Sequence, residues 1–182
     1  NAGTYQMGLT EDSFENKNAN FKVTFEVTDG WLKIDKNEAA VTVTITGNTK
    51  NDTYDETEKT VEGYTTAVEG AKDSEVNVEL KDGAKAEAKG TDAKTYQMGL
   101  TEDSFTVTSN NYENINVVVV DGSLTITPAA VTVTITGNTK TDTYDETEKT
   151  VTGYTFEKTN ELYRDADFGL KDGAKAEAKG TN

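Results

Sequence analysis

Acidic side chains form a cluster whose residue type could bind a metal ion. They lie in one short stretch and recur in a second: Asp52, Asp55, Glu56 and Glu58, then Asp142, Asp145, Glu146 and Glu148. Calcium takes six to eight converging oxygen ligands, many of them carboxylates. The spacing matches no known calcium loop, and Lys50 and Lys59 lie among the acids, so a solvated strand edge is the alternative interpretation. We expect no metal and no cofactor, with the first four acids as weak calcium candidates.

Catalytic residue types are scarce. The chain contains no histidine and no cysteine, the residues used most often for acid–base chemistry near neutral pH, for thiol attack and for transition-metal binding. Two carboxylates that hydrolyse a glycoside would have to converge in a cleft, which the sequence does not indicate. A lysine–asparagine or lysine–aspartate crosslink would need a buried lysine, and the sequence identifies none. We therefore predict no catalytic residues, and a protein that is not an enzyme.

Aromatic residues that occur only once are the candidate interaction sites. Most tyrosines recur along the chain, which favours packing roles. Trp31, Phe156 and Tyr163 do not recur, and Trp31 has the polar counterpart Ser123, which indicates an exposed position. Exposed tryptophans are enriched at interfaces, although a tryptophan that covers a neighbouring linker is an equal alternative.

The charge of the chain excludes several partners. Thirty-three acidic residues against eighteen basic ones give a net charge of -15, which repels nucleic acid and anionic lipid headgroups. No apolar run approaches the roughly 18 residues of a membrane helix, so we expect no membrane insertion. The chain begins at Asn1 without a signal-like segment, and we expect it to be a piece of a longer protein.

An internal repeat organises the whole chain. Residues 41–50 recur unchanged at 131–140, an offset of 90 positions, and residues 53–61 and 81–91 recur with the same offset. Residues 4–14 recur at 95–105. The copies diverge most at residues 66–79 and 156–169, where the flanks stay identical. These segments are either solvent-facing loops that have drifted or variable recognition surfaces.

Alternation of side chains predicts an all-β fold. Val41, Val43 and Ile45 alternate with threonines, which is typical of a strand. Residues 21–27 and 115–119 alternate too, and each run leads through an Asp-Gly pair into a further short strand, which predicts two hairpins. Weaker strands are expected at residues 60–64, 84–89 and 95–100. Single helical turns are expected at residues 9–14 and 100–105, capped by Thr10 and Thr101.

The only proline, Pro128, marks a module boundary. It lies between two predicted strands, where it suits a short, stiff connector. We therefore place the C-terminal half of a repeat module at residues 1–40, a complete module at 41–130 and the N-terminal half of the next at 131–182. The expected fold is all-β, with tandem small modules of about 90 residues, β-sandwich-like or twisted sheets, in an elongated array.

The residues that end the complete module carry a family resemblance. Asn111-Tyr112, a strand, and then Asp121-Gly122-Ser123-Leu124-Thr125-Ile126-Thr127-Pro128-Ala129 resemble the close of the MBG ("mostly beta, glycine rich") repeats of bacterial surface proteins, and Gly3-Thr4-Tyr5 resembles their middle. Lys94 departs from the glycine of that pattern, and Asp35-Lys36-Asn37 departs from its Thr-Pro-Ala linker. The resemblance implies β-rich modules on a secreted or wall-attached bacterial protein, and it supplies no catalytic residues.

A mechanical function follows from the repeat and the resemblance. We expect a structural stalk or fibre-forming repeat of an extracellular bacterial surface protein or adhesin. The alternative is a ligand- or glycan-binding module with its specificity in residues 66–79 and 156–169. The expected partners of the chain are neighbouring copies of itself, by strand complementation or in a continuous repeat array, and a host or cell-wall glycan or protein.

Overall fold

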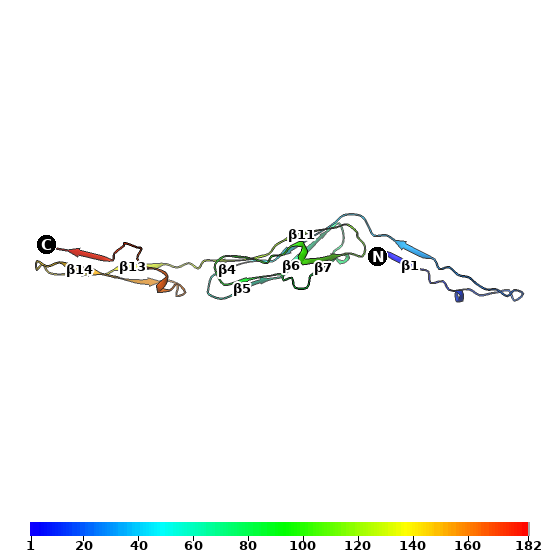
Figure 1. Cartoon of the computed structure of the whole chain (residues 1–182), viewed down its shortest axis with the longest axis horizontal. Helices are drawn as coiled ribbons and strands as arrows, with labels where there is room; N and C mark the ends of the chain where they lie inside the picture. The colour runs from blue at the N-terminus through cyan, green and yellow to red at the C-terminus, as the bar shows by residue number, and fades with distance from the viewer. Residues whose placement is uncertain (182) are drawn as a thin grey trace. The chain divides into compact units, whose positions relative to one another are not determined.

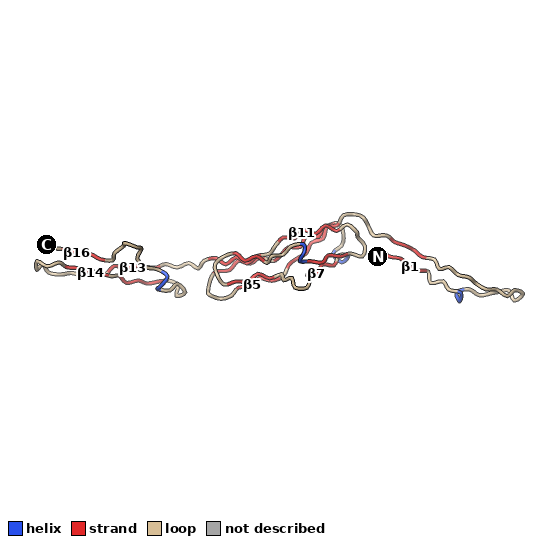
Figure 2. The backbone as a smooth tube through the Cα atoms, viewed as in Figure 1, coloured by secondary structure: helices blue, strands red, loops and turns tan. Residues whose placement is uncertain are grey.

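The computed structural model describes residues 1–181, and these residues confirm the all-β prediction (Figures 1 and 2). The strands are β1 (Gly3–Gln6), β2 (Trp31–Ile34), β3 (Val41–Gly47), β4 (Thr49–Thr53), β5 (Lys59–Glu62), β6 (Tyr64–Glu69), β7 (Asn77–Leu80), β8 (Glu87–Gly90), β9 (Thr95–Gln97), β10 (Phe105–Thr108), β11 (Ile115–Val120), β12 (Ser123–Thr127), β13 (Val133–Gly137), β14 (Lys149–Thr152), β15 (Tyr154–Lys158) and β16 (Glu177–Gly180). Short 3-10 helices are η1 (Glu11–Ser13), η2 (Asp73–Glu75), η3 (Glu102–Ser104) and η4 (Asp165–Asp167). The sheets have the strand orders β1-β2, β10-β7, β11-β3-β6, β4-β12-β9, β13-β15, β14-β16 and β5-β8.

Two compact units make up the chain, and each is described by itself. The first unit comprises Asn1–Lys50, Thr60–Gly90 and Thr95–Leu124. The second comprises Asn51–Lys59, Thr91–Lys94 and Thr125–Asn182. The repeat-based boundaries at residues 40 and 130 stay a prediction.

Strand β3 forms the centre of the first unit. It pairs in parallel with β11 and antiparallel with β6. Its burial alternates along the strand, with Val41, Val43 and Ile45 fully buried. Successive side chains of a strand point to opposite faces, so the predicted alternation of valine and threonine is confirmed, with the aliphatic face inward.

A second, two-stranded sheet covers that aliphatic face. Strands β7 and β10 pair antiparallel, and Leu100 and Phe105 of the η3–β10 region join the three buried residues of β3 in one apolar cluster. The ring of Tyr64 lies edge-on to Phe105, with 5.0 Å between ring centroids. Side chains of two sheets thus share one apolar core.

Both predicted hairpins are wrong. β11 pairs with β3, whereas β12, which follows its Asp-Gly pair, lies between β4 and β9. In the first copy, residues 21–27 are not a strand, and β2 pairs with β1. The reason is that the aspartate does not close a turn between successive strands. Its carboxylate accepts hydrogen bonds from a distant loop: Asp121 from the backbone N–H groups of Gly99 and Leu100, at 3.0 and 2.8 Å.

The weaker elements of the sequence prediction are present, with shifted ends. The predicted helical turns are the 3-10 helices η1 and η3, which follow Thr10 and Thr101. In η1 the N–H of Thr10 donates to Ser13 Oγ at 3.0 Å. The strand expected at residues 60–64 splits into β5 and β6, and those at 84–89 and 95–100 shorten to β8 and β9.

The second unit repeats hydrogen bonds of the first. Asn48 Nδ2 donates to the carbonyl of Glu62 at 2.7 Å, and Asn138 Nδ2 donates to that of Thr152 at 2.9 Å. Segments that recur in the sequence therefore fold locally in the same way. Burial differs, because β13 is mostly exposed where β3 is buried.

Candidate functional site

The acidic stretch forms a tight turn. Asp55 Oδ1 accepts hydrogen bonds from the Thr57 N–H at 3.0 Å and from the Thr57 hydroxyl at 2.5 Å, and Asp55 Oδ2 lies 2.6 Å from Lys59 Nζ. Glu56 has a φ of 64°, a left-handed conformation that is uncommon outside glycine. The second copy builds the same turn from Asp145, Thr147 and Lys149. The central aspartate of each stretch is therefore held by its own turn.

Hydrogen bonding explains the titration of these aspartates. The ammonium of Lys59 and then the hydroxyl and N–H of Thr57 favour the charged carboxylate and lower the pKa of Asp55 to about 2. Lys149 and Thr147 lower the pKa of Asp145 in the same way. Residues 1–181 contain no group of three or more acidic side chains that could hold a metal ion. Asp52, Asp55, Glu56 and Glu58 are thus not brought together as a set of ligands.

Trp31 is an exposed residue, as its polar counterpart Ser123 indicates. It lies on β2, opposite Gln6 of β1, with 61% of its surface accessible. Leu32 of the same strand is exposed to a similar degree. Because successive side chains of a strand point to opposite faces, β2 exposes an apolar side chain on each of its two faces, Trp31 on one and Leu32 on the other.

Phe156 and Tyr163 lie together in the second unit. Phe156 of β15 meets Phe168 edge-on at 4.7 Å between centroids, and Tyr163 stacks on Phe168 at 6.2 Å. The Tyr163 hydroxyl donates to the carbonyl of Asp167 at 2.9 Å. Phe168, which the sequence reasoning missed, joins the two predicted aromatic residues into one cluster.

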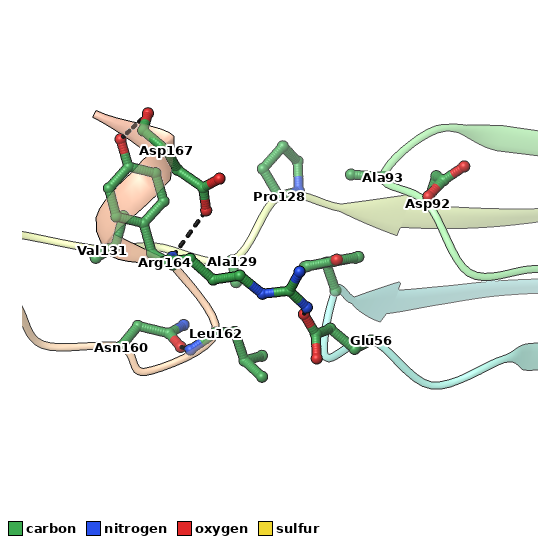
Figure 3. Close-up of a pocket in the computed structure, with 12 residues that line it drawn as sticks. Glu56, Asp92, Ala93, Pro128, Ala129, Val131, Asn160, Leu162, Arg164 and Asp167 are labelled. Carbon is green, nitrogen blue, oxygen red and sulfur yellow. Dashed lines mark hydrogen bonds and ion pairs between the residues drawn. The ribbon is translucent and has the colours of Figure 1, made fainter. Parts of the chain in front are cut away.

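An open cavity of about 440 Å³ adjoins this cluster (Figure 3). Tyr163, Arg164 and Asp167 line it, with Pro128, Ala129 and Leu162 as its apolar part. The remaining lining residues are Tyr54, Glu56, Asp92, Ala93, Val131 and Asn160. The cavity thus combines an aromatic ring, a guanidinium, carboxylates and a few aliphatic side chains.

Arg164 makes two polar contacts at the cavity, one through its side chain and one through its backbone. Its guanidinium lies 2.8 Å from Glu56 Oε1, and its backbone N–H donates to Asp167 Oδ2 at 2.7 Å, a bond drawn as a dashed line in Figure 3. Sequence reasoning missed Arg164, although it is the only arginine of the chain and lies in the divergent segment 156–169. Those two features together could have found it.

The divergent segments contain strands as well as loops. Residues 66–79 include most of β6, all of η2 and the start of β7, and residues 156–169 include part of β15 and all of η4. Both segments therefore contribute strands to sheets. Most of their side chains are nevertheless exposed to solvent, and the interpretations as drifted surface segments and as recognition surfaces both stay predictions.

The crosslink chemistry lacks one requirement. Among residues 1–181 no charged side chain is buried, so the buried lysine that a spontaneous isopeptide bond needs is missing from this part of the chain. The 3-10 helices described here are single turns of three residues, too short to cross a membrane.

Comparisons with known protein families, with curated proteins and with solved structures returned no match to this chain. The resemblance to the MBG repeats stays a prediction.

Proposed function

We propose that this chain is a structural stalk or fibre-forming repeat of an extracellular bacterial surface protein or adhesin, built from tandem modules of about 90 residues that resemble MBG repeats. The pairing of β3 with β11 is the observation that carries the proposal. β3 opens the central repeat, which is the complete module predicted at residues 41–130, and β11 lies near its end. The two strands run parallel over six residue pairs, from Ile115 opposite Val41 to Val120 opposite Thr46.

The parallel pairing of β3 with β11 determines how the central repeat responds to a pulling force. A pull along the chain enters at Val41 and leaves beyond β12, so it draws β3 and β11 in opposite directions along their shared ladder. Parallel ladder hydrogen bonds are evenly spaced along the strands. All of them are therefore loaded together in shear instead of opening one at a time, which suits a module that transmits force.

Single-molecule force spectroscopy of the full chain tests this function. Thr44 and Val118 are opposite residues, and the chain has no native cysteine, so Thr44→Cys with Val118→Cys gives one defined clamp. We expect a distinct unfolding peak for the reduced protein. Oxidation should remove about 260 Å from the length released, because the 74 residues from position 44 to position 118 are then shielded at about 3.5 Å each.

A register-shifted pair provides the control. Thr42→Cys with Val118→Cys places the thiols two residues apart along the ladder, and we expect no clamp from it. A reduced chain that extends without a resolved peak would count against a force-bearing function. The extracellular location is tested separately, by labelling intact cells of the encoding organism with an antibody to the chain.

One observation favours ligand or glycan binding as a second candidate function. Five residues of the divergent segment 156–169 line the cavity of the second unit: Asn160, Leu162, Tyr163, Arg164 and Asp167. An aromatic ring beside hydrogen-bonding groups is a common arrangement for small-molecule recognition. The segment in which the copies differ is thus also the one that contributes most to the cavity.

A glycan array with the purified chain tests the second candidate. Arg164→Ser replaces the guanidinium with the small side chain found 90 positions earlier, at Ser74, and should abolish binding to any glycan that the wild type binds. Glu11→Ser, at an exposed residue of η1 in the first unit, is the matched control. Equal array profiles for wild type and Arg164→Ser would exclude this cavity as the site.

A further inference from the structure

The N-terminal segment exposes the residue types that the central repeat buries. Residues 4–14 have the sequence of 95–105, and Asp29-Gly30 begins a segment equivalent to that beginning at Asp121-Gly122. The exposed fractions of equivalent residues are Leu9 38% against Leu100 5%, Phe14 45% against Phe105 4%, Leu32 59% against Leu124 0%, and Ile34 45% against Ile126 2%. One apolar face is thus covered in the central repeat and uncovered in residues 1–34.

The C-terminal segment exposes the opposite side of the same core. Residues 131–140 have the sequence of 41–50, yet Ile135 is 56% exposed where Ile45 is fully buried. In the central repeat, β3 is covered by β11 and by the cluster that contains Leu100 and Phe105. Residues 131–181 contain the equivalent of β3 but no residues equivalent to that cover.

Two glycines of the C-terminal segment, Gly137 and Gly180, leave room for another chain to approach its backbone closely. A Cβ on Gly47 would lie 2.4 Å from the backbone nitrogen of Gly122, and a Cβ on Gly90 would lie 2.0 Å from the Tyr96 ring. The equivalent residues Gly137 and Gly180 have no atom within 4 Å of such a Cβ. The same bare backbone therefore faces open space in the C-terminal segment.

We propose that residues 131–180 form a docking surface for a segment with the sequence of residues 1–34, in the register of the central repeat, and that two copies of this 182-residue chain bind each other through these two segments. Residues 23–28 then pair in parallel with residues 131–136, as β11 pairs with β3: Val23 lies opposite Val131, Phe25 opposite Val133 and Val27 opposite Ile135. Gly30 lies against Gly137, as Gly122 lies against Gly47. This inference rests on the proposed structural function and specifies its partner and geometry.

The identity of the partner follows from the sequences of the two faces. The central repeat shows that a segment like 92–126 and a segment like 41–90 form one core, and the terminal segments carry the same two sequences. The two faces differ from each other, so the contact is heterologous. A heterologous contact that does not close into a ring extends into an open chain, and we expect linear polymers that grow with concentration.

Cysteine crosslinking between full-length variants tests the register. Glu26 and Thr134 are equivalent to Val118 and Thr44, which lie opposite each other in the central repeat. A disulfide needs Cα atoms roughly 4.4 to 6.8 Å apart, close to the spacing of paired strands. Mixing Glu26→Cys with Thr134→Cys under mild oxidation should give a covalent heterodimer. Thr136→Cys is displaced by two residues, about 6.6 Å along the strand, and should form little covalent heterodimer with Glu26→Cys.

Glycine substitutions test the contact without cysteines. Gly137→Ala places a methyl group where Gly30 of the partner must approach, and it should weaken association by about tenfold or more in sedimentation velocity across a dilution series. Gly169→Ala is the matched control, because Gly169 also has open space around it and its counterpart in the central repeat is Glu79, which already carries a side chain there. It should leave association unchanged.

The outcomes separate this inference from the proposed function. The proposed contact is supported if Glu26→Cys forms a heterodimer with Thr134→Cys but not with Thr136→Cys. Weaker association of Gly137→Ala would support it further. Polymers with equal crosslinking at both positions would overturn the register, although a copy-to-copy contact would remain. A monomer at all concentrations, or a disulfide only within one chain in the Glu26→Cys/Thr134→Cys double variant, would overturn the inference. In both cases the force measurement on the central repeat still decides the structural function independently.

Discussion

Ile45 and Ile135 allow one stability experiment to be performed twice in the same sequence. Each is the fifth residue of an identical block, Val-Thr-Val-Thr-Ile-Thr-Gly. Ile45 is fully buried between β11 and β6, whereas Ile135 on β13 is 56% exposed. We predict that Ile45→Ala destabilises the chain strongly and that Ile135→Ala does not.

The magnitude follows from the atoms removed. Isoleucine to alanine deletes three carbon atoms, and each buried CH₂-sized group contributes about 0.8 kcal/mol, or about 2.4 kcal/mol in total. The cavity left in a well-packed core adds to this, and measured costs for such changes are about 2 to 5 kcal/mol. We therefore expect about 3 to 4 kcal/mol for Ile45→Ala and less than about 0.5 kcal/mol for Ile135→Ala.

Urea unfolding at low protein concentration, followed by tyrosine fluorescence and circular dichroism, is the assay. Dilution keeps separate copies apart, so that contacts between them do not contribute. Equal losses of unfolding free energy for the two variants would refute the reasoning, because they would show that β13 is buried as deeply as β3. A loss below about 1 kcal/mol for Ile45→Ala would refute the assignment of this residue to the core.

Three further predictions concern backbone contacts and pH. Asp121→Ala removes the acceptor for the N–H groups of Gly99 and Leu100 and should cost about 1–3 kcal/mol in urea unfolding; Asp29→Ala removes the equivalent bonds of an exposed segment and should cost less than about 0.5 kcal/mol. The carboxyl carbon of Asp55 should titrate with a midpoint near 2 in NMR. Because this folded pKa lies below the ordinary value of about 3.9, the turn's stabilisation is complete above pH 4 and is lost as the pH falls through 2; Lys59→Gln should move the midpoint up, and an unchanged midpoint would contradict the assigned cause. Gly47→Ala should destabilise the folded chain by about 1–3 kcal/mol or more, because its Cβ would meet backbone at 2.4 Å, whereas Gly137→Ala should leave the dilute monomer as stable as wild type.

Local patterns predicted the strands but not their partners. The alternation at residues 41–47 correctly identified β3 and its inward face, and Thr10 and Thr101 correctly marked two helical turns. The hairpins were wrong because Asp-Gly is a frequent hairpin turn, whereas here the carboxylate of Asp121 binds a loop about twenty residues earlier. Nothing local to residues 115–120 indicates that they pair in parallel with a strand 74 positions earlier.

Prediction of the candidate site was limited for a similar reason. Phe156 and Tyr163 were found because they have no counterpart in the other copy, and both adjoin Phe168. Glu56 was grouped with its acidic neighbours, yet its carboxylate lies beside Arg164, 108 positions away in the sequence. Long-range pairs of this kind depend on the fold and are not encoded in local spacing.

Burial in this chain depends on context and not on local sequence. Two identical blocks, residues 41–47 and 131–137, have opposite environments, since one has a fully buried aliphatic face and the other is mostly exposed. The difference must come from the segments that cover them, which lie more than fifty residues later in the central repeat. In repeat proteins, a unit gains stability from the segments that pack against it. The valine, isoleucine and glycine positions of residues 131–137 match those that β3 presents to β11 and to Leu100 and Phe105. They therefore specify the shape and the apolar character of the segment that can cover them.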